Sequence, residues 1–186
     1  MSVRVNRRGV VDCRATLDIP LSATSIWGQL RDFRRYARHD FFHAEMTLDG
    51  GIPRAGAALT LCHRYAGFRV DRVGRILIWR EGVGYSFSDL STRGPRAGFP
   101  HVLSYRLQPA GQSSCRLHIR VRGLWTARHV PRWAAWLWLT WVFGHIVRNV
   151  RNELMIFQIW RRQRGLPRAC SGVSDTQTDS GSSPAQ

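Results

Sequence analysis

Apolar and polar residues alternate along much of the chain. From Val10 to Ile19 the apolar side chains fall on one side of an extended backbone, the pattern of a half-buried strand. In the segment 114–125, Leu117, Ile119 and Val121 alternate with arginines and a histidine, which indicates an antiparallel sheet with one apolar face. Five more segments carry strand signals and are separated by turn residues: 44–49, 57–65, 68–80, 84–90 and 101–109.

Two short helices are predicted after the first strand. Pro20 ends that strand, and Ser22 or Thr24 is placed to cap a helix over 25–33. A second short helical segment is predicted over 34–42. Both therefore precede the main run of strands.

After residue 131 the apolar period changes from 2 to 3.6 residues, which predicts one long amphipathic helix. Four of the eight tryptophans lie between Trp133 and Trp141, and the stretch from Trp133 to Val147 has no charged residue. That stretch is shorter than the roughly 20 residues a membrane span needs, and the apolar stripe continues beyond it. The stripe consists of Trp136, Leu139, Phe143, Val147, Val150, Leu154 and Phe157.

Together these elements predict an α+β fold in which a curved antiparallel sheet of six to seven strands wraps around the long C-terminal helix. A sheet with one apolar face needs a cover, and the last helix is the only long amphipathic element available. The predicted organisation is a flexible N-terminus at 1–9, one domain at 10–165 and a disordered Ser/Gly-rich tail at 166–186.

Three stretches carry a family resemblance: ATLDIPLSATSIWGQLRDFRRYARHD, GGIPRAGAALTL and YRLQPAGQSSCRLHIRV. In the first, Ile26-Trp27, Asp32-Phe33 and Tyr36 follow a strand and a proline turn. Over about residues 11–162 the chain resembles the START-like (SRPBCC) superfamily of helix-grip proteins, the polyketide cyclase/dehydrase and lipid-transport domains. It departs at Asp40, where many relatives have tryptophan. The resemblance implies a cavity between sheet and helix for a small hydrophobic ligand such as a lipid, quinone or polyketide, and it supplies no catalytic motif.

Strand parity predicts which side chains face that cavity. The parity that buries Leu61 also turns His63 and Tyr65 inward, and in 101–109 the inward leucines bring His101 to the same side as Tyr105. In 84–90 the inner set is Tyr85, Phe87 and Asp89. The predicted ligand-binding residues are Leu61, His63, Tyr65, Tyr85, Phe87, Leu103, Tyr105, Trp136, Leu139 and Phe143.

The candidate chemistry leaves open whether the protein is an enzyme. His63 and Tyr65 could orient a ligand hydroxyl or carbonyl, His63 could act as a general base, or both could be satisfied core residues. His145 and Asn149 share a helix face, but no third metal ligand accompanies them. No metal and no cofactor is expected, and catalytic residues are not assigned.

The large positive net charge does not by itself identify a class of binding partner. The formal net charge is +16, yet every basic residue is arginine and the arginines are dispersed, so dedicated nucleic-acid binding is not expected. The four cysteines form no CxxC pair, and the N-terminus lacks a signal-peptide core. We expect a cytoplasmic protein with free thiols, as monomer or homodimer.

Three functions remain open. The first is a binding or carrier protein for a hydrophobic ligand, and the second is a cyclase- or aromatase-like enzyme with a cavity acid/base residue. The third is a lipid or quinone chaperone peripheral to the inner membrane, since Trp133, Trp138 and Trp141 lie partly off the apolar stripe and positive charge surrounds them.

Overall fold

The structure is a computed structural model of the chain and describes residues 1–33, 43–65, 68–91, 99–127 and 129–164. The side chains of residues 43, 44, 65, 68 and 91 are outside the description. The predicted second short helix over 34–42 and the predicted tail at 166–186 also lie outside the described residues.

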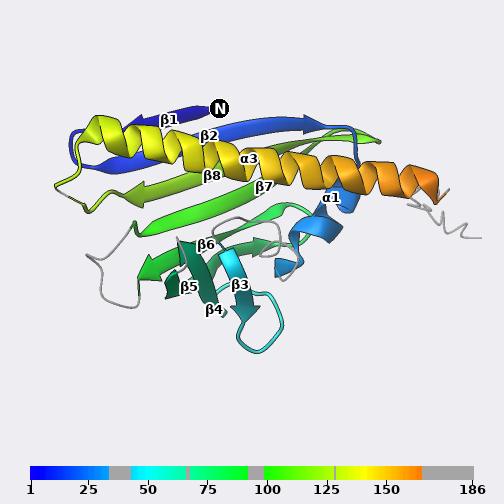
Figure 1. Ribbon diagram of the computed structural model, residues 1–186. Coiled ribbons are helices and arrows are strands. Elements are labelled where there is room, and N and C mark those ends of the chain that lie inside the picture. The colour runs from blue at the N-terminus through cyan, green and yellow to red at the C-terminus, as the bar shows by residue number, and fades with distance from the viewer. Residues whose placement is uncertain (34–42, 66–67, 92–98, 128, 165–186) are drawn as a thin grey trace, which may run out of the picture.

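The described residues form an antiparallel sheet of eight strands, two helices and their connections (Figure 1). The sheet order is β1-β2-β8-β7-β6-β5-β4-β3, so β1 and β3 are its edges. The curved sheet gripping a long C-terminal helix confirms the predicted fold. The elements are β1 (Ser2–Val5), β2 (Val10–Ile19), α1 (Ala23–Leu30), β3 (His43–Leu48), β4 (Ala58–Tyr65), β5 (Phe68–Arg80), β6 (Gly84–Ser91), β7 (His101–Gly111), β8 (Ser114–Leu124) and α3 (Arg132–Gln163).

The N-terminus differs from the prediction, because part of the segment expected to be flexible forms strand β1, which raises the count above six to seven strands. β1 pairs with β2 in antiparallel register, with Val3 opposite Cys13. Val3 and Val5 are half-buried and pack against the core. Gly9 makes the intervening turn possible, since its φ of +79° is in the left-handed region. Four residues with two apolar positions were too few to signal a strand.

Helix α1 begins where the sequence predicted a cap. The Ser22 hydroxyl accepts a hydrogen bond from the Ser25 backbone N–H at 3.3 Å. Three of its own residues are buried: Ile26, Trp27 and Leu30. The helix therefore closes one end of the sheet, below the C-terminal half of α3 (Figure 1).

Helix α3 lies across the sheet and buries one face against it (Figure 1). Leu139, Phe143, Val150 and Leu154 from the predicted stripe are buried, and so the amphipathic helix is confirmed. Trp136 is the exception: its side chain is 44% exposed and its indole N–H donates to the Val3 carbonyl at 3.2 Å. Trp136 therefore fastens the helix to edge strand β1.

A register shift in β5 reverses which of its side chains face inward. The shift falls between Ile76 and Ile78: before it Arg72 and Ile76 point inward and Val73 is exposed, and after it Trp79 packs against the buried Tyr85. Gly74 lies on the inward set, and a Cβ there would come within 2.0 Å of the Ser88 carbonyl. The close approach of β5 and β6 at Gly74 thus fixes the position of Arg72 beside β6.

Candidate functional site

A cavity of about 510 Å³ lies between α3 and the sheet. Its size is in the range of small-molecule binding sites. Most of its wall is apolar and comes from both layers, with Leu103, Val121 and Val70 on strands and Leu139, Val142, Phe143 and Ile146 on α3.

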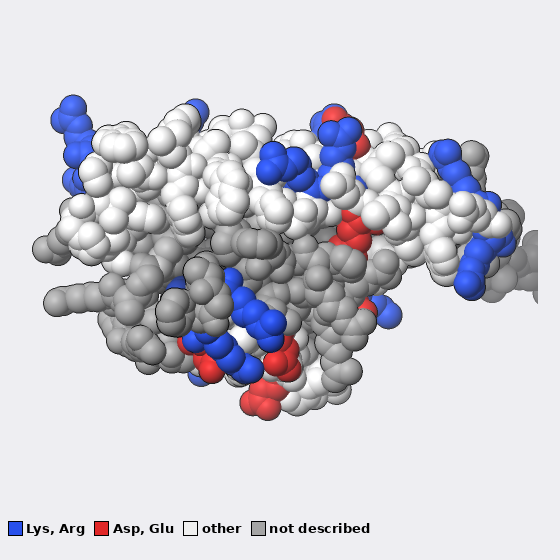
Figure 2. Space-filling model, viewed as in Figure 1, with Lys and Arg blue, Asp and Glu red and all other residues white. Residues whose placement is uncertain are grey.

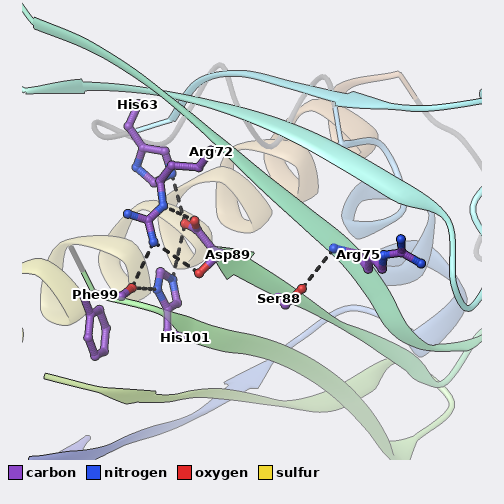
Figure 3. A network of polar contacts seen from close by, with 7 residues as sticks. All are labelled: His63, Arg72, Arg75, Ser88, Asp89, Phe99 and His101. Carbon is purple, nitrogen blue, oxygen red and sulfur yellow. Dashed lines mark hydrogen bonds and ion pairs between the residues drawn. The ribbon is translucent and has the colours of Figure 1, made fainter. Parts of the chain in front are cut away.

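One end of the cavity is polar, and four neighbouring strands build it (Figure 3). His63, Arg72, Asp89 and His101 come from β4, β5, β6 and β7 respectively, one side chain from each. The register places Asp89 directly opposite His101. The sheet therefore carries a row of four charged or titratable side chains across its inner face. We call these four residues the Asp89 cluster.

Asp89 is the centre of the cluster and has no exposed side-chain surface. Its Oδ2 lies 3.0 Å from His63 Nε2 and 3.7 Å from His101 Nε2. Arg72 donates from Nε to Oδ1, and its Nη2 donates to the backbone carbonyls of Asp89 and Phe99 at 3.2 and 3.1 Å. These three partners come from three different strands, so the cluster also ties the sheet together.

The surroundings of Asp89 keep its carboxyl ionised. Burial alone raises the pKa of Asp89, but the hydrogen bond from His63 and the charges of His101 and Arg72 outweigh it. The pKa of Asp89 is consequently held well below its usual range. A buried negative charge with these partners is uncommon in a cavity wall that is otherwise apolar.

The rim of the cavity is aromatic. Trp125 and Trp138 line it, with ring centroids 5.7 Å apart, and Phe99 stacks on His101 at 4.9 Å. Trp138 is 38% exposed and His129, another lining residue, is also exposed. The cavity therefore meets the surface beside the first turns of α3.

The structure distributes the predicted ligand-binding residues over several places. His63, Leu103, Leu139 and Phe143 line the cavity. Trp136 lies outside it on the exposed side of α3, because its position on the helix faces β1 rather than the sheet interior, so its predicted place in the wall is wrong. The side chain of Tyr65 is outside the described residues. The rest are buried in the core without lining the cavity: Leu61, Tyr85, Phe87 and Tyr105.

Tyr85 shows why an inward side chain need not reach the cavity. It is fully buried among Trp27, Phe33 and Trp79, and its hydroxyl donates to the Leu30 carbonyl at 3.0 Å. This aromatic group fills the space under α1. The inner face of the sheet thus has a filled end under α1 and a hollow end under the first half of α3.

Three members of the Asp89 cluster were missing from the predicted site. Strand parity predicted that Asp89 and His101 face inward. A buried carboxylate needs a charged or hydrogen-bonding partner, and this requirement could have marked the two residues as a pair. Arg72 was missed because the register shift in β5 makes its parity ambiguous. The predicted site consisted mostly of aromatic and apolar side chains at inward positions, and so these charged residues were left out of it.

Other candidates do not add to the site. Cys13 lines the cavity, and burial raises the pKa of its thiol to about 12, so it is a neutral wall residue. His118 is on the outer face of β8, where its ring lies within hydrogen-bond distance of Thr16 and Gln108. Within the described ranges, no group of three His, Cys, Asp or Glu side chains is arranged to hold a metal ion.

No protein-family model matches the chain, and no curated protein does. Solved structures do match it. An aromatase/cyclase from Streptomyces sp. R1128, Zhui, superposes with a TM-score of 0.62 at 16% identity, covering 88% of this chain and 99% of that one. The chain has the START-like helix-grip fold.

Two further helix-grip structures extend the comparison. A START superfamily protein from Mycobacterium smegmatis has a TM-score of 0.58 at 14% identity, covering 78% of this chain and 98% of that one. The di-domain aromatase/cyclase StfQ of the steffimycin biosynthetic pathway has a TM-score of 0.66 at 12% identity, covering 84% of this chain and 54% of that one. At such identities the likeness concerns the fold, so the function has to be argued from the site.

Proposed function

We propose that the protein binds one small, mainly hydrophobic molecule in the cavity beneath α3. The observation that carries this proposal is an apolar cavity of about 510 Å³ with polar groups gathered at a single end. Apolar walls provide affinity, and a few convergent polar groups fix orientation. Lipids, quinones and polyketides with one polar end fit this description.

The first test is to fill the cavity. Val142 lines it from α3, so Val142→Trp is expected to occupy ligand space, whereas Leu137→Trp adds the same side chain on the exposed face of the helix. Each protein is purified from its own host and analysed by native mass spectrometry and by solvent extraction. We expect a reproducible apolar molecule with the wild type and with Leu137→Trp, and none with Val142→Trp. Equal recovery from all three would place the molecule elsewhere and contradict the proposal.

An acid/base enzyme is a second candidate, because His63 and Asp89 form a buried pair at 3.0 Å inside the cavity. A carboxylate that fixes a histidine is a common arrangement for proton transfer. Two of the neighbours are named aromatase/cyclases, which is consistent with this candidate. Once a ligand is extracted, His63→Gln is expected to retain its binding and to abolish any turnover. Unchanged turnover in that variant would exclude His63 as the acid/base group.

Peripheral membrane attachment is a third candidate, favoured by the exposed face of α3. Trp133 and Trp141 are 67% and 53% exposed, and Leu137 between them is 52% exposed. Figure 2 shows a largely uncharged surface over this half of the helix and arginines along the other half. Indoles bind at the interface of a bilayer, and arginines favour anionic headgroups.

In this proposal a cytoplasmic protein exchanges its ligand at the inner membrane, since Trp138 belongs both to the exposed surface and to the cavity rim. None of the helices in the described part of the chain has the length and hydropathy of a membrane-spanning segment. Attachment would therefore be to the bilayer surface.

Liposome flotation tests the attachment. Trp133→Ser/Trp141→Ser is expected to reduce binding to anionic vesicles at least about tenfold, because two interfacial indoles are lost. Val73→Ser/Leu77→Ser removes two apolar residues, each 47% exposed, from the outer face of β5 and serves as the control. Equal flotation of both variants would contradict the proposal, and a dimer on gel filtration that only the tryptophan variant loses would assign the surface to a second copy.

A further inference from the structure

The arginines are dispersed along the sequence, but the sheet gathers six of them on one face. Strands β1, β2, β8 and β7 are neighbours in the sheet, and inward side chains alternate with outward ones in each of them. Their outward positions hold two aspartates, Asp12 and Asp18, and six arginines. The arginines are Arg4, Arg14, Arg106, Arg116, Arg120 and Arg122. We call this surface, on the side of the sheet away from the cavity, the outer arginine face.

Asp12 lies at the centre of four of these arginines. The strand register places Arg4 of β1 on one side of Asp12 and Arg122 of β8 on the other, each directly opposite it. The carboxylate nevertheless accepts its hydrogen bonds from Arg14 and Arg120, which face each other in the next row of the sheet. One carboxylate is thus surrounded by four guanidinium groups and binds two of them.

Three arginines of the face have no carboxylate partner. Arg4, Arg106 and Arg122 are exposed, and their side chains make no ion pair or hydrogen bond within the part of the chain that the structure describes. Arg106 lies opposite His118, whose ring is within hydrogen-bond distance of two neutral side chains instead. We call these three residues the open arginines. Each presents a planar fork of N–H donors that matches the shape of a carboxylate.

The charge of this face opposes the pairing of its own strands. Like charges directly opposite each other in neighbouring strands are destabilising, and Arg14 lies opposite Arg120. Asp12 offsets that repulsion because it binds both guanidinium groups. The open arginines receive no such compensation from the described residues. A partner that carries negative charge would supply it.

The neighbouring side chains indicate which kind of anionic partner fits. Among the residues described on these four strands, the outward positions hold no Phe, Tyr or Trp, and many have short or neutral polar side chains, such as Thr16, Ser104 and Gln108. Single-stranded nucleic acids bind through base stacking on aromatic rings, and bilayer interfaces bind aromatic and apolar side chains. The face is also convex, because the sheet curves around α3, so a flat bilayer would touch only part of it (Figure 1).

A protein surface meets these conditions better. Its acidic residues can bind the open arginines, while its own basic or hydroxyl groups can face Asp12 and Asp18, and such mixed complementarity is typical of protein interfaces. A second copy of the same face does not fit, because it would bring arginines against arginines. Four strands about 4.8 Å apart make a face roughly 15 Å wide, which accommodates one α-helix of about 10 Å in diameter.

We propose that the outer arginine face docks an acidic helix of a protein partner, with Arg4, Arg106 and Arg122 binding its Asp or Glu side chains. Arginine forms bidentate hydrogen bonds with carboxylates, and these are stronger than hydrogen bonds between neutral groups. Docking here is independent of the ligand, because the cavity lies on the opposite side of the sheet.

Fluorescence anisotropy with two labelled peptides tests the docking. Both are alanine-based helices with the same number of glutamates, which lie along one side of the first helix and all around the second. We expect the one-sided peptide to bind the wild type at least about threefold more tightly, since more of its carboxylates reach the face at once. Equal affinity for the two peptides would overturn the assignment of a helix as the partner.

A matched pair of variants locates the binding. Arg4→Gln/Arg106→Gln/Arg122→Gln removes the open arginines, and Arg54→Gln/Arg148→Gln/Arg151→Gln makes the same change in net charge at three exposed positions elsewhere. We expect the first variant to bind the one-sided peptide at least about tenfold more weakly than the wild type and the second no more than about twofold, because only the first loses hydrogen bonds to charged groups. Equal losses would show that net charge alone decides, which would overturn the proposal.

Decauridine and phosphatidylglycerol vesicles test the other anionic partners. Their binding is expected to fall by similar factors in both triple variants, as for nonspecific attraction to a basic protein. If either probe loses affinity in the open-arginine variant alone, the face fits a nucleic acid or a bilayer, and the assignment to a protein partner is overturned. All six substituted positions are exposed, so both variants are expected to unfold at the same urea concentration as the wild type.

Discussion

Asp12 and Asp89 are both paired with arginines but lie on opposite faces of the sheet. Asp12 lies on the outer face, where Arg120 donates to both carboxylate oxygens at 2.9 Å and Arg14 also donates to both, at 2.6 Å in its shortest contact. Asp89 lies on the inner face, with Arg72 and two histidines around it. In both cases the partners hold the pKa of the carboxyl well below its usual range.

The two ion pairs differ in the free energy needed to remove their charges from water. The Asp12 side chain is 21% exposed, so water solvates it in the absence of its arginines, whereas that of Asp89 has no exposed surface. Surface ion pairs contribute about 0–1 kcal/mol to stability, and a buried pair is often no better than an apolar pair of the same shape. The outer pair therefore joins β2 to β8 at little cost, whereas the inner pair carries a desolvation cost and stands at the polar end of the cavity.

Removing the charge of Asp89 is expected to have the largest effect. Asp89→Asn leaves Arg72 buried without its counter-charge and should lower the free energy of unfolding by about 3–5 kcal/mol. Urea denaturation followed by circular dichroism measures this. Asp18→Asn, at an exposed pair with Arg116, is the control and should cost no more than about 1 kcal/mol. Similar losses at both sites would remove the contrast between the inner and outer faces.

Replacing the whole inner pair by apolar residues is expected to restore part of that loss. Arg72→Met/Asp89→Leu should be more stable than Asp89→Asn by at least about 2 kcal/mol, because no unpaired charge remains. Urea denaturation of the two variants measures the difference. A double variant no more stable than Asp89→Asn would contradict the assignment of the loss to an unpaired buried charge.

Acid should weaken the protein through the same carboxyl. The pKa of Asp89 is lower in the folded than in the unfolded state, so the unfolded chain binds more protons as the pH falls. The stability that Asp89 provides is complete above the unfolded pKa of about 4 and decreases below it. Urea midpoints measured between neutral and acidic pH should fall less steeply for Asp89→Asn than for the wild type. Parallel curves would mean that Asp89 does not contribute.

The smallest effect is expected on the outer face. Asp12→Asn keeps the side-chain shape and leaves Arg14 and Arg120 in contact with water, so it should cost about 1 kcal/mol or less. The cost should decrease as salt is added, since partly exposed charges are screened. Urea midpoints at low and high salt measure this. A loss of unfolding free energy as large as that of Asp89→Asn would contradict the view that water solvates the outer pair.

The fold could be predicted from the sequence because it depends on periodicity. The alternation in Val10–Ile19 and the 3.6-residue stripe from Leu139 to Leu154 are long enough to specify a sheet and its covering helix. Strand β1 was missed because four residues carry too little pattern. An element of four residues thus shows no recognisable period, whereas six residues were enough for β3.

The site was predictable only in part, because it depends on register rather than on period. Parity alone placed His63 and Asp89 inward. Which residues meet depends on strand pairing, which sets Asp89 opposite His101. It also depends on the shift between Ile76 and Ile78, which lets Arg72 and Trp79 face inward although they are seven residues apart. No single strand carries that information.

The short strand β1 also shortens the exposed edge of the sheet, because it has four residues and β2 has ten. It occupies one side of β2, and Trp136 fastens α3 to its backbone through Val3. Deleting residues 1–5 would leave the N–H and C=O groups of β2 open as a template for the strands of other molecules. We expect light scattering to show association of the truncated chain at concentrations where the full chain stays dispersed. Strand β1 thus limits the unpaired edge on this side of the sheet to four residues.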